Sequence, residues 1–138
     1  MQLSQIFSLA ALASVVSAIT VSYDPGYDNR DRSLTAVSCS DGPNGLMTRK
    51  SWRKQGDIPV FPFIGGAQVI AGWGSPNCGT CWKLEFQGQS INVLAIDHTD
   101  AGFNIAQAAM DKLTNNQAVQ LGRIDAKATQ IDSKKCGM

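Results

Sequence analysis

The features that this sequence lacks exclude several classes of function. It has one histidine, no Asn-x-Ser/Thr acceptor for glycosylation, no internal repeat and no low-complexity segment. Its twelve Lys and Arg nearly balance its eleven Asp and Glu, so the net charge is +1. Binding to phosphate backbones requires a dense field of basic side chains. The balance therefore argues against nucleic acid as the main partner and leaves neutral polymers as candidates.

Long hydrophobic runs are also missing, except at the start. Residues 1–18 carry no charged side chain, and an apolar run is followed by the small residues Val16, Ser17 and Ala18. A transmembrane helix needs about 20 apolar residues, whereas the apolar region of a secretory signal needs about 7–15. We therefore interpret residues 1–18 as a secretory signal peptide rather than a buried helix. Residues 19–138 are expected to form one secreted domain with no membrane span.

The four cysteines, Cys39, Cys78, Cys81 and Cys136, all lie in the expected domain. An even number of cysteines in an oxidising compartment predicts two disulfides, and three pairings are open at this point. The alternatives are a redox dithiol at Cys78 and Cys81, or half of a zinc site. Export and the isolation of Cys39 and Cys136 disfavour both. We predict structural disulfides, no metal site and no cofactor.

Short strands dominate the expected secondary structure. Stretches rich in β-branched and aromatic residues, or alternating apolar with polar residues, predict strands. These stretches are residues 19–23, 33–39, 82–86, 91–96 and 123–131. The first ends at the turn Asp24-Pro25-Gly26, and the third and fourth pair across Gln87-Gly88-Gln89.

Helices are expected in two places. A short one covers residues 46–52, with Asn44 as its cap, and the clearest covers residues 104–115. In the second, Ile105, Ala109 and Leu113 recur at helical spacing, so this face should pack on the sheet. Residues 56–79 combine Gly and Pro with aromatics, which indicates an ordered connection. Together these elements predict a small closed barrel.

Six strings of residues carry a family resemblance. They are Val21-Ser-Tyr-Asp-Pro-Gly-Tyr, Ser33-Leu-Thr-Ala-Val-Ser-Cys-Ser-Asp-Gly, Ala71-Gly-Trp-Gly-Ser-Pro-Asn-Cys-Gly-Thr-Cys-Trp, Val93-Leu-Ala-Ile-Asp-His, Ala101-Gly-Phe-Asn-Ile and Cys136-Gly. Over residues 19–138 the chain resembles the cerato-platanin family of small secreted fungal proteins. The resemblance implies a six-stranded double-psi β-barrel, the fold also seen in the first domain of expansins. It also implies disulfides joining Cys39 to Cys78 and Cys81 to Cys136.

The same resemblance implies a function on cell walls. Cerato-platanins bind chitin-type oligosaccharides and loosen cellulosic material without hydrolysing it, and many act as elicitors or toxins toward plants. We therefore expect a non-enzymatic protein that binds chitin oligomers or cellulose, with expansin-like loosening and an elicitor or phytotoxic role. A plant receptor is a further candidate partner. The expected state is a secreted monomer, with self-assembly and retention in the fungal cell wall as alternatives.

Five side chains are candidates for sugar binding. Planar polar groups bind sugar hydroxyls, and aromatic rings offer an apolar floor. Asp97 ranks first because it follows a strand at the rim of the expected barrel, where sites are usually built, and because the resemblance implies one central aspartate. Tyr23 and Asp24 rank second, and Asn104 and Asp41 are weaker. The structural alternatives are turn or helix capping for the polar residues and core packing for Tyr23.

Other conspicuous side chains have simpler interpretations. His98 neighbours Asp97, but without a nucleophile a surface or packing role is favoured over acid–base work. Among the tryptophans, Trp82 is expected in the core, and Trp73 is open between packing and sugar stacking. The basic run at residues 49–54 is interpreted as a solvated helix face, with contact to anionic pectin or a membrane surface as the alternative.

Two other functional classes compete with binding. A glycoside hydrolase needs two carboxyl groups about 5–5.5 Å or about 6.5–9.5 Å apart, and Asp24, Asp41, Asp97 and Asp100 are candidates. An interaction protein would instead use apolar loop residues such as Phe61 and Phe63 for self-assembly or receptor contact.

Overall fold

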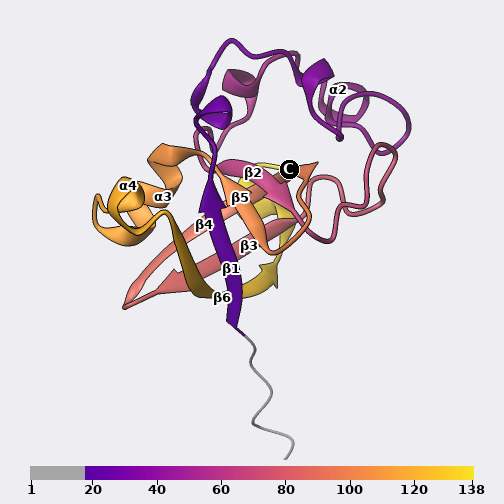
Figure 1. Ribbon diagram of the computed structural model, residues 1–138. Coiled ribbons are helices and arrows are strands. Elements are labelled where there is room, and N and C mark those ends of the chain that lie inside the picture. The colour runs from indigo at the N-terminus through magenta and orange to yellow at the C-terminus, as the bar shows by residue number, and fades with distance from the viewer. Residues whose placement is uncertain (1–17) are drawn as a thin grey trace, which may run out of the picture.

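The computed structural model describes residues 18–138, and the expected signal peptide lies outside them except for Ala18. Six strands form a closed barrel in the order β1-β5-β2-β4-β3-β6 (Figure 1). They are β1 (Ala18–Tyr23), β2 (Ile64–Ala67), β3 (Cys81–Phe86), β4 (Gln89–His98), β5 (Phe103–Ile105) and β6 (Arg123–Ile131). β1 pairs with β5 and β2 with β4 in parallel, and the other pairs are antiparallel. The expected closed six-stranded barrel is confirmed.

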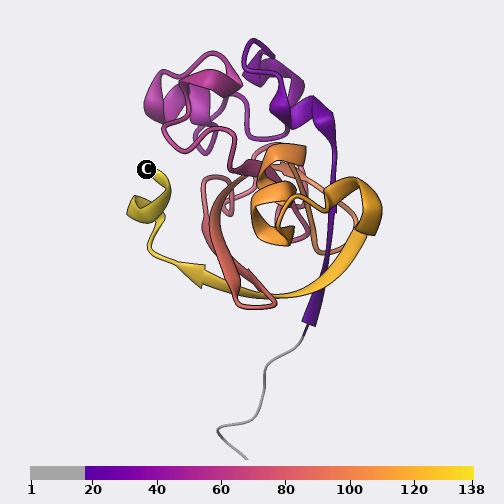
Figure 2. The ribbon, with the colours of Figure 1, turned by 90° about the vertical axis from the view of Figure 1, so that its left-hand side faces the viewer.

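The helices are short and lie outside the barrel. They are α2 (Leu46–Lys50), α3 (Gln107–Thr114) and α4 (Ala118–Leu121), with 3-10 turns η1 (Pro25–Asp28), η2 (Leu34–Ala36), η3 (Gln55–Asp57) and η4 (Ser133–Cys136). Figures 1 and 2 both place residues 24–63, which we call the cap, over one end of the barrel. Within residues 18–138, none of the helices has the length and apolarity needed to cross a bilayer.

One apolar core joins the barrel to the cap. Barrel residues such as Leu84, Leu94 and Ile105 and cap residues such as Leu34 and Leu46 are all fully buried in one cluster. Because side chains alternate across a strand, β6 buries its alternate residues, as its sequence predicts.

Two disulfides reinforce this arrangement. Cys39 of the cap is bonded to Cys78, and Cys81 of β3 is bonded to Cys136 of η4. This is the pairing that the family resemblance implies. The bonds close loops with sequence separations of 39 and 55 residues. Loops of this length contribute about 4 kcal/mol each in the chain-entropy treatment.

Residues 33–39 do not form the expected strand. They contain the single turn η2 followed by bends, and only Ser33 makes an isolated bridge, to Lys54. The Ser33 hydroxyl caps the turn by accepting from the amide of Thr35. A local side-chain bond of this kind competes with strand pairing. The β-branched composition therefore predicted the wrong element.

The helix expected over residues 104–115 begins three residues late. Phe103–Ile105 is the strand β5, which lies between β1 and β2, and α3 starts at Gln107. Its first amides donate to the carboxylate of Asp28, at 2.7 Å from Gln107 and 2.9 Å from Ala108. Asn104 is therefore not a helix cap. Asp28, from residues 24–63, binds the first amides of α3 instead.

Two smaller expectations also fail. Asn44 does not cap α2, because the N-cap of this helix is Gly45. The side-chain amide of Asn44 donates instead to the carbonyl oxygen of Gly74 at 2.9 Å. The connection 56–79 is ordered, as expected, but it contains the strand β2. Ile64-Gly-Gly-Ala has no strand-like composition, so only its pairing with β4 and β5 makes it a strand.

The β3–β4 hairpin turns over two residues rather than three. Gln89 pairs with Phe86, so the loop is Gln87 and Gly88. Both loop residues have positive φ, 48° and 82°, as a type I′ turn requires.

Two glycines allow the packing of the barrel to be tested. Gly102 has φ +61, and a Cβ there would collide with the carbonyl oxygen of Thr20. We expect Gly102→Ala to lower the free energy of unfolding by more than about 2 kcal/mol, since it adds this collision to the strain of positive φ. Gly88→Ala is the matched control because its φ is +82 with open space around it; about 1 kcal/mol is expected. Urea denaturation measures both, and equal losses would contradict the close approach.

Candidate functional site

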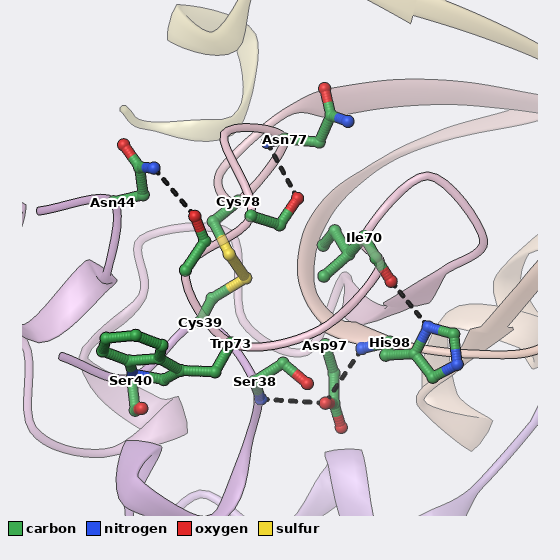
Figure 3. Close-up of a disulfide and its surroundings, with 12 residues drawn as sticks. Ser38, Cys39, Ser40, Asn44, Ile70, Trp73, Asn77, Cys78, Asp97 and His98 are labelled. Carbon is green, nitrogen blue, oxygen red and sulfur yellow. Dashed lines mark hydrogen bonds between the residues drawn. A yellow bond between two sulfur atoms is a disulfide. The ribbon is translucent and has the colours of Figure 1, made fainter. Parts of the chain in front are cut away.

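Asp97 lies at the end of β4 and joins the barrel to the cap. Its Oδ1 accepts from the amides of Ser38 and His98, both at 2.9 Å, and its Oδ2 accepts from the Tyr27 hydroxyl at 2.7 Å. Figure 3 shows the two amide bonds. A carboxylate offers about four lone-pair positions. Three are used by the protein, and Asp97 is only half-buried, so one acceptor position remains for a further donor.

Tyr27 is the least exposed member of this cluster. Its side chain is 4% exposed, and the guanidinium of Arg32 lies over its ring at 5.4 Å. Burial, and then the hydrogen bond and charge of Asp97, raise the pKa of the Tyr27 phenol well above its ordinary value. Tyr27 therefore stays protonated and donates to Asp97 at any physiological pH.

The register of the sheet places Asp97 in line with other polar residues. Asp97 pairs with Gly66, Gly66 with Asn104, and Asn104 with Ser22. Because residues at one register level share a face, these side chains point outward while neighbours such as Ile105 are buried. The Ser22 hydroxyl donates to Asn104 Oδ1 at 3.0 Å. We call Ser22, Asn104, Gly66 and Asp97 the polar row.

Gly66 allows the chain after β4 to pass close to the sheet. A Cβ at Gly66 would lie 2.9 Å from the carbonyl oxygen of His98 and 3.3 Å from Cβ of Thr99. Thr99 therefore lies over the middle of the polar row, between Asp97 and Asn104.

Tyr23 and Asp24 lie beside the Asp97 cluster without hydrogen bonding to it. Tyr23 is half-buried against the core, and Asp24 is exposed and accepts from the amide of Gly26 at 2.8 Å. The charge of Asp24 contributes to the raised pKa of Tyr27, which places the two groups near each other. The structural roles foreseen for both residues are thus present.

Asp41, the last candidate, belongs to a different group. Its Oδ1 accepts from the indole Nε1 of Trp73 at 2.7 Å and from the Ser40 hydroxyl at 3.3 Å. These donors, with the Trp73 bond first, lower the pKa of the Asp41 carboxyl. The segment Ser38–Asp41 connects this pair to Asp97, because the amide of Ser38 donates to Asp97 Oδ1.

Sequence reasoning missed two members of the Asp97 cluster. Tyr27 stands in the first family-like string, so its position was visible but its partner was not. Ser38 takes part through its backbone amide, which leaves no sequence signal. The position of such an amide depends only on the path of the cap.

The remaining candidates have structural partners. Trp82, expected in the core, is half-buried at its edge and packs against Phe103 with ring centroids 5.4 Å apart. Phe61 and Phe63 are half-buried against the core rather than prominent on the surface. Lys50 lies 6.0 Å over the ring of Trp52.

Within residues 18–138, no three His, Cys, Asp or Glu side chains lie together as metal ligands would.

The comparisons with known proteins agree with this geometry. The family model described as Cerato-platanin matches residues 19–138. The chain is 52% identical over 118 residues to Allergen Asp f 15 of Aspergillus fumigatus, covering 86% of this chain and 76% of that one. It is 39% identical over 132 residues to cerato-platanin of Ceratocystis fimbriata f. sp. platani, covering 94% and 95%.

Solved structures match equally well. The crystal structure of cerato-platanin 2 from M. perniciosa superposes with a TM-score of 0.84 at 46% identity, covering 88% of this chain and 99% of that one. The solution structure of the fungal elicitor Cerato-Platanin gives 0.77 at 40% identity, covering 85% and 95%.

The protein is thus a small disulfide-linked barrel of six strands with an outward polar row at the end of β4. It belongs to the cerato-platanin family. The related proteins are named as allergens, antigens and an elicitor rather than as enzymes.

Replacing Tyr27 tests the link between cap and barrel. Tyr27→Phe keeps the ring but leaves Asp97 Oδ2 without its donor, so the free energy of unfolding should fall by about 1.5–3 kcal/mol. Tyr23→Phe is the matched control, because among the described residues the Tyr23 hydroxyl has no hydrogen-bond partner; it should change stability by less than about 0.5 kcal/mol. Chemical denaturation of both variants decides, and equal stabilities would contradict the assigned bond.

His98 should titrate above its ordinary pKa of 6.5. Its Nδ1 lies 2.6 Å from the Ile70 carbonyl oxygen and its Nε2 lies 3.1 Å from Asp100 Oδ1, so both nitrogens face acceptors. These bonds favour the charged ring, and their stabilising effect is complete below pH 6.5 and is lost as pH rises through the raised pKa. Because the sequence has one histidine, a single NMR titration curve reports it. Asp100→Asn should shift the midpoint downward, and an unchanged midpoint would exclude the Asp100 contact.

Proposed function

We propose that this protein binds cell-wall polysaccharide, with chitin oligomers and cellulose as ligands, through the surface around Asp97, and that it does so without cleaving glycosidic bonds. The observation that carries the proposal is the held carboxylate of Asp97. Three donors orient it at the barrel surface, and an acceptor position remains. A fixed acceptor binds a sugar hydroxyl without the entropy loss of ordering a free side chain.

The partly exposed position of Asp97, at the same register level as Asn104 and Ser22, supports a polymer as ligand. A polysaccharide chain needs length rather than depth, and the polar row offers Asn104 and Ser22 further along the same face. Asp24 lies near Tyr27 and extends the polar surface toward η1, and Tyr23 precedes it at the end of β1. Competition of these groups for the hydrogen bonds between polysaccharide chains accounts for loosening without hydrolysis.

The contacts of Asp97 support the non-hydrolytic part of the proposal. A glycoside hydrolase needs one carboxyl group that carries a proton to the leaving oxygen. Asp97 accepts hydrogen bonds at both oxygens, and Tyr27 remains protonated beside it. In these contacts both Asp97 oxygens act as acceptors, and neither donates a proton.

An elicitor or phytotoxic role toward plants, and retention of the secreted protein in the fungal cell wall, belong to the same proposal. One support is the description of a related structure as a fungal elicitor. Binding of wall oligosaccharides would bring the protein to the surface where both roles act.

Titration with a chitin hexamer tests the proposal. By NMR, signals of residues around Asp97 and Tyr23 should shift, and by calorimetry Asp97→Asn should weaken binding at least about tenfold. The control is Asp125→Asn, which changes an exposed carboxylate on β6 and should leave affinity unchanged. A reducing-end assay on chitin should stay flat.

Three results would contradict the proposal. Wild-type protein that does not bind the hexamer removes the ligand class, and full affinity of Asp97→Asn removes Asp97 from the surface. Reducing sugar that is released by the wild type and absent with Asp97→Asn would establish a hydrolase instead. Circular dichroism of each variant checks that the barrel remains folded.

A further inference from the structure

Trp73 is unusual among the three tryptophans because its ring is exposed. It is 64% exposed, whereas Trp52 and Trp82 are half-buried. The ring of Trp82 packs on Phe103, and its Nε1 donates to the Thr80 hydroxyl at 2.8 Å. An exposed indole loses the free energy that its burial would contribute. Such a ring is a candidate for contact with a ligand.

The Trp73 ring is exposed but held in place. Its Nε1 donates to Asp41 Oδ1 at 2.7 Å, and its benzo ring lies against the backbone of Gly42. Gly42 has φ +78, and a Cβ there would approach Cζ2 of the indole to 2.8 Å. A side chain at that position would therefore displace the ring. The disulfide from Cys39 to Cys78 and the Asn44–Gly74 bond fix the two loops that carry these groups (Figure 3).

The chain on either side leaves the ring accessible. A Cβ at Gly72 or at Gly74 would meet no heavy atom within 4 Å, so both flanking residues lie in open space and neither carries a side chain. A rigid aromatic ring whose two neighbouring residues carry no side chain is suited to stacking against a flat ligand. Stacking on a ring already held in place avoids the cost of ordering it.

Asp41 supplies the polar part of the same group. Its Oδ1 is occupied by Trp73 and Ser40, and the side chain is exposed, so Oδ2 is open to a donor from a ligand. The hydrogen bonds also lower the pKa of this carboxyl, so it stays an acceptor in acidic surroundings. An apolar ring face beside a charged acceptor matches a pyranose, whose axial C–H groups form an apolar face and whose hydroxyls point outward at its edge.

We propose that Trp73 and Asp41 form a second sugar-binding subsite, in which the indole stacks on one pyranose ring of a β-linked polysaccharide and Asp41 Oδ2 accepts one of its hydroxyls. The inference rests on the proposed function, because the ligand is the same polymer that Asp97 binds. The amide of Ser38 donates to Asp97, and Asp41 follows three residues later. Three residues of extended chain span at most about 11 Å, so one oligosaccharide of several units reaches both groups.

The experiment compares the chitin hexamer with the chitin dimer by calorimetry. Trp73→Ala should weaken hexamer binding about tenfold, while Trp73→Phe, which keeps a ring, should lose much less. The dimer offers fewer pyranose rings to the two groups than the hexamer does, so wild-type affinity for the dimer should be below that for the hexamer. Val119→Ala removes another exposed apolar side chain, 65% exposed on α4, and should change nothing.

Fluorescence provides a second readout. Trp73 is the exposed indole, so hexamer binding should shift the emission to the blue in wild-type protein and leave the emission of Trp73→Phe unchanged. Asp41→Ala removes the acceptor that holds Nε1 and should reduce affinity, whereas Asp41→Asn retains an acceptor and should lose less.

The outcomes separate the two proposals. If the wild-type protein does not bind the hexamer, both are overturned. If it binds, and Trp73→Ala binds equally well with no wild-type emission shift, the subsite is overturned and the Asp97 surface stands. If Trp73→Ala instead changes the sedimentation of the free protein and leaves affinity intact, the ring is a contact between copies of the chain and the subsite is also overturned.

Discussion

The hydrogen bonds accepted by Asp97 hold the cap on the barrel. One carboxylate at the end of β4 binds a hydroxyl from η1, an amide from residue 38 and the amide of the next residue. The cap has little regular structure of its own, only short turns and the five-residue helix α2. Its path therefore depends on such cross-links, on the Cys39–Cys78 disulfide and on the shared apolar core.

This arrangement gives Asp97 a structural role, to which the proposed sugar binding would add a functional one. The donors that hold the cap also orient the carboxylate, so the acceptor that remains is fixed relative to the sheet. A small domain with few buried residues gains precision at its surface from such shared contacts, because each ordered group serves packing and recognition together. The same holds for Trp73, whose anchor Asp41 follows the segment bound to Asp97.

The elements predicted correctly are those in which local pattern and tertiary pairing agree. β6 alternates from Arg123 to Thr129 and occupies the range expected. β1 and the β3–β4 pair differ from expectation by only a few residues at their ends. The elements predicted wrongly are segments whose secondary structure depends on the strands that pair with them. Ile105 fits a helical repeat, yet Phe103–Ile105 is a strand because β1 and β2 flank it. Residues 33–39 have strand composition but no partner strand.

The sequence alone determined the protein's class. Its four cysteines, its alternating strands and its family-like strings indicated a disulfide-linked barrel, and the rank of Asp97 came from its place after a strand. The tertiary structure alone decided which groups meet. Tyr27 and the Ser38 amide reach Asp97 across 70 and 59 residues of chain, and Trp73 reaches Asp41 across 32. Hydrogen bonds at such separations depend on how the chain folds back on itself, and no local pattern of residues encodes that path.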